Sequence, residues 1–114
     1  SNAFLKLTGT LRKKQVGLYV QLCTNHAPLN QHLHRINRSD TPACLQCGGT
    51  VLESIHHYLF QCPRYDRERH TLHLKLGRAA TSINHLLTNS NAQVHLLRYI
   101  NATGRMKDVF GDVP

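Results

Sequence analysis

Residues 44–63 read CLQCGGTVLESIHHYLFQCP, a stretch that holds three cysteines and two adjacent histidines. Cys44 and Cys47 are separated by two residues, and Cys62 follows both histidines. Three thiolates and one neutral imidazole form a closed tetrahedral site for Zn²⁺, in which no position remains for water. A closed site of this kind is structural, because a catalytic zinc keeps one position open. The stretch therefore predicts one structural Zn²⁺ that stabilises a small fold.

The spacing leaves two choices for the histidine ligand. His56 and His57 both precede Cys62 at separations that zinc sites use. Cys23 is far from this stretch and next to the apolar Leu22, so we expect a small core residue rather than a further ligand. From the residues alone, both histidines remain candidates.

The four cysteines could instead form disulfides or a redox-active pair. Cys44 and Cys47 are too close to suit a structural bridge, and the histidines that follow fit a metal better. A redox Cys-x-x-Cys motif belongs to a βαβ pattern, which the surrounding sequence lacks. We therefore favour zinc, which implies reduced cysteines and a location in the nucleus or the cytoplasm.

Apolar residues recur at helical spacing along most of the chain. The first helix is expected to begin at a cap on Thr8 or Thr10 and to end near Thr24, with Leu18 and Leu22 on its apolar face. Further helices are expected at residues 29–36, 51–61, 63–76, 82–88 and 91–102.

Local signals refine this pattern. Thr50 and Glu53 have the spacing of a capping box for the helix over 51–61, and Gly48-Gly49 permits a tight turn before it. Ile83 and Val94 belong to the apolar sets of the last two helices. The expected class is all-α, a small helical domain organised around one structural Cys3His zinc knuckle, with at most a short extended pair near the metal loop.

Residues 1–3 have the composition of a remnant of tag removal, and we set them aside. Residues 4–114 are expected to form a single zinc-binding helical domain, excised from a longer polyprotein. No apolar run in the sequence approaches the roughly 20 residues of a membrane helix, so no membrane partner is expected. A domain of this size builds only a modest core, which a metal bound on folding would reinforce.

The chain is strongly basic, with 14 lysines and arginines against six aspartates and glutamates and a formal charge of +8. This excess indicates a polyanionic partner, and RNA or DNA is the simplest one. The expected phosphate contacts are Arg12, Lys13, Lys14, Arg35, Arg38, Arg64, Arg67, Lys75 and Arg78. Candidate stacking groups are Tyr19, Tyr58, Tyr65 and His26, although the tyrosines suit the core better.

No catalytic constellation is apparent in the sequence. The six carboxylates are scattered and form no acidic cluster for metal-dependent nuclease chemistry. Cys23 and His26 are one helical turn apart, but no acid that would orient the histidine accompanies them. We therefore expect a non-catalytic domain.

Several short motifs match one family. They are LCTNHAPLN at residues 22–30 and LHRI at 33–36, Pro42 with Cys44 and Cys47, Glu53 with His57, Leu59, Cys62, Pro63, Tyr65 and Arg69, and the closing Leu86-Leu87, Arg98-Tyr99-Ile100 and Ala102-Thr103-Gly104-Arg105. Together they resemble the C-terminal zinc-binding (Cys-Cys-His-Cys) domain of fungal non-LTR (LINE-type) retrotransposon polyproteins. In that family the domain follows reverse transcriptase and ribonuclease H domains.

The resemblance implies His57 rather than His56 as the fourth ligand, because the family's histidine has the same position relative to its last cysteine. It also implies a role in retrotransposition, in which the domain holds template RNA or target DNA near the polymerase. The chain departs from the family at Asn25, where glycine is usual, and near Cys23, where arginine is common. The alternative is a protein-interaction module that docks onto the polymerase or ribonuclease H domain, or onto a host partner, through an exposed apolar patch.

Overall fold

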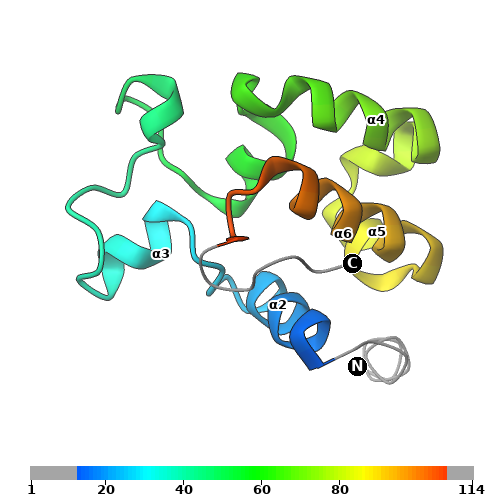
Figure 1. The fold of residues 1–114 in the computed structure, drawn as a ribbon, viewed down its shortest axis with the longest axis horizontal. Coiled ribbons are helices and arrows are strands. Elements are labelled where there is room, and N and C mark those ends of the chain that lie inside the picture. Colours follow the sequence, from blue (N-terminus) through cyan, green and yellow to red (C-terminus); the bar gives the residue numbers. More distant parts are fainter. Residues whose placement is uncertain (1–12, 108–114) are drawn as a thin grey trace.

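The computed structural model describes residues 13–107, which form helices joined by short turns (Figure 1). The α-helices are α2 (Lys13–Cys23), α3 (Asn30–Arg35), α4 (Asp66–Leu76), α5 (Ile83–Thr88) and α6 (Ser90–Thr103). Shorter turns are 3-10 helical at Leu45–Cys47, Pro63–Tyr65 and Gly77–Thr81, and π-helical at His57–Gln61. Within the described residues the only β-type pairing is an isolated bridge between Ala43 and Leu52, so the predicted all-α class is confirmed. No helix in this part of the chain has the length and apolar character needed to cross a membrane.

The last two helices begin where the sequence supplies polar caps. Ser82 accepts a hydrogen bond of 3.2 Å from the backbone N–H of His85 and caps α5. Asn89 accepts one of 3.0 Å from Ala92 and caps α6 in the same way. Each cap satisfies a backbone donor that has no partner inside its helix. The observed bounds of both helices agree with the predicted ones within one residue.

The break after α2 also forms as predicted. Asn25 adopts a left-handed backbone conformation with φ 62°, which asparagine tolerates better than most residues. The N–H of His26 then donates to the carbonyl of Gln21 at 2.8 Å and closes the end of the helix. Asparagine at this position is therefore compatible with the turn.

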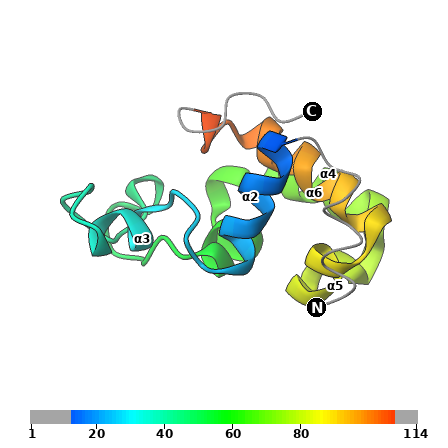
Figure 2. The ribbon, with the colours of Figure 1, turned by 90° about the horizontal axis from the view of Figure 1, so that it is seen from below.

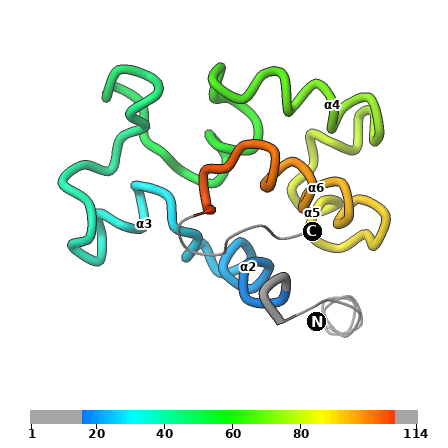
Figure 3. The backbone as a smooth tube through the Cα atoms, viewed as in Figure 1, coloured from blue at the N-terminus to red at the C-terminus, as the bar shows by residue number. Residues whose placement is uncertain are grey.

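The helices divide the molecule into two ends. α4, α5 and α6 pack together at one end, α3 and the turn that contains Cys44 lie at the other, and α2 lies between them (Figures 1 and 2). The C-terminal end of α6 returns to the middle of the molecule (Figure 3). There the hydroxyl groups of Thr103 and Tyr58 lie 2.6 Å apart and form a hydrogen bond.

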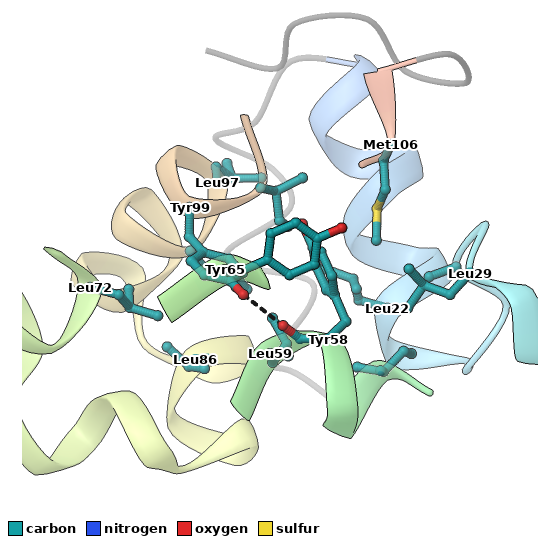
Figure 4. Close-up of a cluster of buried hydrophobic side chains, with 14 of the residues drawn as sticks. Leu22, Leu29, Tyr58, Leu59, Tyr65, Leu72, Leu86, Leu97, Tyr99 and Met106 are labelled. Atoms are coloured by element: carbon teal, nitrogen blue, oxygen red, sulfur yellow. Dashed lines mark hydrogen bonds between the residues drawn. The ribbon is translucent and has the colours of Figure 1, made fainter. Parts of the chain in front are cut away.

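The core contains residues from nearly all of these elements. Its buried side chains include Leu18, Leu22, Leu29, Tyr58, Leu59, Tyr65, Leu72, Leu86, Leu97, Tyr99 and Met106 (Figure 4). The ring of Tyr58 meets those of Tyr65 and Tyr99 edge-on, with centroids 5.3 and 5.5 Å apart. This geometry is favoured for aromatic pairs, and it gives these tyrosines a role in the core. Of the candidate stacking groups, only His26 is exposed, and its ring stacks on His32 with centroids 5.0 Å apart.

The predicted helix over residues 51–61 begins four residues later than expected, at Ile55. Residues 51–53 instead run beside residues 42–44, where two backbone hydrogen bonds of 2.6 and 2.9 Å join the segments. The hydroxyl of Thr50 donates to a carbonyl of the metal loop at 3.3 Å, and Ser54 accepts a backbone hydrogen bond of 3.0 Å from the following turn. The expected capping box is therefore wrong, because extended pairing already satisfies this backbone.

Three residues that were predicted to be buried are exposed in the structure. Cys23 is exposed, and so are Ile83 (40%) and Val94 (48%). α6 turns Leu96, Leu97 and Ile100 into the core, which leaves Val94 on its outer face. The start of the first helix, with its predicted cap on Thr8 or Thr10, lies outside the described residues.

Candidate metal centre

Two short segments present the four predicted ligands. Cys44 precedes the 3-10 turn and Cys47 ends it, while His57 begins the π-helical turn and Cys62 directly follows it. After Cys47 the chain reverses through two glycines with φ of 71° and 78°, a region that other residues enter only under strain. The second glycine donates its N–H to the carbonyl of Cys44 at 3.3 Å. This folds the loop back on itself, and the predicted tight turn is confirmed.

The four ligand atoms all lie within 4.8 Å of one another. The Cys62 sulfur lies 3.8 Å from that of Cys44 and 3.9 Å from that of Cys47. Nε2 of His57 lies 3.4 Å from the Cys47 sulfur. In a tetrahedron with metal–sulfur bonds of about 2.3 Å and a metal–nitrogen bond of about 2.0 Å, the corresponding separations are about 3.8 Å and about 3.5 Å. The donor set and its spacing therefore suit a tetrahedral metal ion.

Three of the four ligands are buried, and the cysteines form no disulfide. Cys44 and Cys62 are fully buried, and His57 is almost so. Burial raises the pKa of the Cys44 and Cys62 thiols, because the interior disfavours the charged thiolate. All four cysteines of the chain are free, so neither disulfide alternative is formed. Among the residues that the structure describes, this is the one group of three or more such side chains that could hold a metal ion.

The structure brings His57 into the cluster and leaves His56 outside it. His56 is exposed, and its ring lies against Phe60 with centroids 5.1 Å apart. Nδ1 of His57 is buried and has no hydrogen-bond partner within the described part of the chain. In most metal-bound histidines this second nitrogen donates to a carboxylate or carbonyl. Its position agrees with the ligand that the resemblance implies.

Arg69 and Tyr99 hold the backbone from which Cys62 projects. The guanidinium of Arg69 is buried and donates to the carbonyls of Cys62 at 2.9 Å and Leu59 at 3.0 Å. The hydroxyl of Tyr99 donates to the carbonyl of Tyr58 at 2.6 Å (Figure 4). Carbonyls at the end of a helical turn lack partners inside it, and these two side chains supply them. The sequence marked Arg69 as a motif residue but could not show which carbonyls it contacts.

Replacing Tyr99 by phenylalanine is expected to lower the free energy of unfolding by about 0.5–1.5 kcal/mol, because the buried carbonyl of Tyr58 loses its shorter hydrogen bond and keeps only the one from Arg69 at 3.4 Å. Tyr65→Phe is the matched control, since no residue of the described chain hydrogen-bonds to its hydroxyl, and it should change stability by less than about 0.5 kcal/mol. Urea unfolding of the metal-loaded protein measures both. Equal losses in the two variants would show that the Tyr99 hydroxyl does not stabilise the turn.

A buried carboxylate ties residues 42–53, which form the metal ribbon, to the segment after α6. Glu53 is 3% exposed and accepts hydrogen bonds of 2.6 and 2.9 Å from Nη2 and Nε of Arg105. The backbone N–H of Asn30 donates to the same carboxylate at 2.6 Å, and the Asn30 side chain donates to the carbonyl of Ala43 at 2.8 Å. The hydrogen bonds that Arg105 donates to Glu53 raise the pKa of Arg105, because they favour the charged guanidinium. This network joins the start of α3, the metal ribbon and the segment after α6.

The predicted phosphate-contacting residues lie in separate groups. Arg12 lies outside the described residues, and Lys13 and Lys14 belong to the first turn of α2. Exposed cations lie beside α3 (Arg35 and Arg38), in the turn that contacts Leu45–Cys47 (Arg64), and on α4 and the turn after it (Arg67, Lys75 and Arg78). Because α3 and α4 lie at opposite ends of the molecule (Figure 1), these cations are not gathered in one place. Arg98 of α6 is also exposed and was not predicted.

Comparison with known proteins finds no relative of this chain. No protein-family model matches it, and neither a curated protein nor a solved structure matches it at a significant level. Its function is therefore inferred from its own residues and their geometry.

Proposed function

We propose that this chain is a zinc-stabilised nucleic-acid-binding domain of a retrotransposon reverse transcriptase, which holds template RNA or target DNA during retrotransposition. The observation that supports nucleic-acid binding best is the set of arginines and lysines in the described part of the chain that are exposed and form no salt bridge there. The link to a reverse transcriptase rests on the resemblance of the metal motif and its flanking residues. In this proposal the domain is non-catalytic and acts in the nucleus or the cytoplasm.

Zinc is the metal that the donor set favours. Three thiolates and an imidazole are soft or borderline ligands, whereas calcium and magnesium require oxygen. Four protein ligands in a tetrahedral arrangement are typical of structural zinc, which leaves no position for a reacting water. Bound there, the ion would supply a cross-link between the metal ribbon and the π-helical turn.

Most exposed cations have no acidic neighbour. Among the described residues, the ion pairs involve only Arg69 with Asp66 and Arg105 with Glu53. No carboxylate of this part of the chain lies within salt-bridge distance of Arg35, Arg38, Arg64, Arg67, Lys75, Arg78, Arg98 or Lys107. Unpaired surface cations can neutralise phosphates and release the counterions condensed on a nucleic acid.

Fluorescence anisotropy of the zinc-loaded domain with single-stranded RNA, single-stranded DNA and duplex DNA tests the proposal. Dissociation constants of about 10⁻⁴–10⁻⁶ M near physiological salt, with a linear log–log dependence on salt, are the expected result for phosphate contacts. Absence of binding to all three polymers at low salt would overturn it.

Reversing three charges on α4 and the turn before it is expected to weaken this binding. The triple variant carries Arg64→Glu, Arg67→Glu and Lys75→Glu together. The loss of three phosphate contacts would lower the slope of the salt dependence of its binding by about 2–3 on the log–log plot. Because all three side chains are exposed, the thermal unfolding of the variant should stay close to that of the wild type. An unchanged affinity would remove the α4 surface from the proposal.

One observation favours protein docking as a second function. A cavity of about 790 Å³ between the end of α2, α5 and residues 54–56 is lined by polar and apolar side chains, and the apolar ones include Val20, Ile55, Ile83 and Leu87. Val20 and Ile83 are 38% and 40% exposed. An exposed apolar surface of this kind suits a partner protein, such as the polymerase or ribonuclease H domain or a host protein. Docking through it would persist at high salt, whereas phosphate contacts would weaken.

A further inference from the structure

A groove between α4 and α6 combines exposed cations with an apolar floor. The two helices pack against each other, and the groove that they enclose has a volume of about 380 Å³. Arg67 and Lys75 of α4 and Arg98 of α6 line it and are exposed. Leu72 and Tyr99 also line it but are buried, so they form its base. The groove can therefore contact a charged group and an apolar surface at the same time.

The cations lie on both sides of this groove. Arg67, Thr71 and Lys75 follow one another at intervals of four residues and so share one face of α4. At 1.5 Å per residue, the positions of Arg67 and Lys75 lie about 12 Å apart along the helix axis. Arg98 projects from α6 on the other side, next to the half-buried His95. An extended anionic chain in the groove would therefore meet positive charge along its length and from both walls.

Glu68 is the one carboxylate in the lining. Its Oε2 atom is buried and has no hydrogen-bond partner among the described residues. The three cations form no salt bridge with it or with any other carboxylate in this part of the chain. The groove is therefore net cationic.

We propose that this groove holds a segment of single-stranded nucleic acid, with its phosphates on Arg67, Lys75 and Arg98 and one base against the apolar floor. The proposal rests on the proposed nucleic-acid-binding function and assigns that function to one site and one form of the polymer. An unpaired nucleotide offers both charge and an apolar face, whereas a duplex keeps its bases inside the stack and offers the groove only phosphates. The volume lies within the range of about 300–1,000 Å³ that is typical of small-ligand pockets, so one nucleotide can enter.

Three substitutions in the zinc-loaded domain test the groove. For each variant, fluorescence anisotropy measures binding to mixed-sequence oligonucleotides of single-stranded RNA, single-stranded DNA and duplex DNA. Arg98→Gln removes one phosphate contact and should reduce the steepness of the salt dependence for single strands by about 0.7. Ala102→Leu fills the exposed end of the groove without changing the charge, and it should weaken single-strand binding about fivefold or more. Glu68→Gln removes the opposing charge and should tighten binding. RNA and DNA share this chemistry, and comparing the two single strands shows whether the 2′-hydroxyl contributes.

Arg35→Gln is the control, because it makes the same change of charge beside α3, at the other end of the molecule. The proposal requires a larger loss with Arg98→Gln than with Arg35→Gln. Equal losses of affinity with these two variants, or wild-type affinity of Ala102→Leu, would show that the groove is not the binding site. Neither result would contradict nucleic-acid binding elsewhere on the domain. Tighter binding of the wild type to duplex DNA than to either single strand would also overturn it. Failure of the wild type to bind any of the three polymers would instead remove the underlying function.

Discussion

Withdrawal of the metal is expected to unfold the domain. Structural zinc sites in small peptides supply an apparent free energy of about 10–16 kcal/mol at pH 7, which is as large as the whole net stability of about 5–15 kcal/mol of a typical domain. Here the site joins the metal ribbon to the π-helical turn, and that turn contributes Tyr58 and Leu59 to the core. Addition of a strong zinc chelator should therefore abolish the cooperative thermal transition and the near-ultraviolet circular dichroism of the buried tyrosines.

Substitution of a ligand should have the same effect. Cys62→Ser removes a fully buried sulfur from the cluster, and we expect a largely unfolded chain. Cys23→Ser is the matched control, because Cys23 is exposed and lies outside the cluster, so stability should change by less than about 0.5 kcal/mol. An unchanged melting temperature after chelation, or equal stability of the two variants, would contradict a structural metal.

Removal of the Arg105 guanidinium is expected to have the second largest effect. In Arg105→Met the carboxylate of Glu53, whose side chain is 4% exposed, would keep its charge without its partner. Removing one member of a buried ion pair costs about 3–5 kcal/mol, because the remaining charge stays desolvated. Urea unfolding of the metal-loaded variant should therefore show a lower midpoint with an unchanged slope. Arg35→Met, at an exposed and unpaired arginine, is the control.

A second substitution shows whether the loss of stability comes from the unpaired charge of Glu53 or from the side-chain contacts of Arg105 that are lost. Glu53→Gln in the Arg105→Met background removes the charge but keeps an acceptor for the N–H of Asn30. The double variant should therefore recover about 1–3 kcal/mol relative to Arg105→Met. If the double variant is no more stable than the single one, the buried charge is not the source of the loss.

Local signals in the sequence were sufficient for much of this fold. The spacing of the cysteines predicted a cluster that the structure forms, and Ser82 and Asn89 lie at the starts of α5 and α6, where the periodicity placed helices. These features depend on neighbours a few residues apart, so the chain alone specifies them. The helix over 51–61 was misjudged for the opposite reason. Its capping signal competes with pairing to residues 42–44, and only the tertiary structure decides that competition.

Long-range contacts could not be predicted. Glu53 was interpreted as a capping residue because its partner Arg105 is 52 positions away. The cations were known, but their grouping depends on which helix packs against α4, so Arg98 was missed. The exposure of Val94 has a similar cause, since the rotation of α6 about its axis is set by contacts with the rest of the core. Spacing within one helix says nothing about its neighbours.

The metal content and coordination of the protein, purified without added metal, test the central claim most directly. Native mass spectrometry combined with X-ray absorption at the zinc edge should find one zinc per chain, with three sulfurs at about 2.3 Å and one nitrogen at about 2.0 Å. The same measurement on Cys62→Ser should show loss of the ion. A metal-free folded protein, a disulfide between two of the three clustered cysteines, or an oxygen ligand in place of His57 would contradict the account.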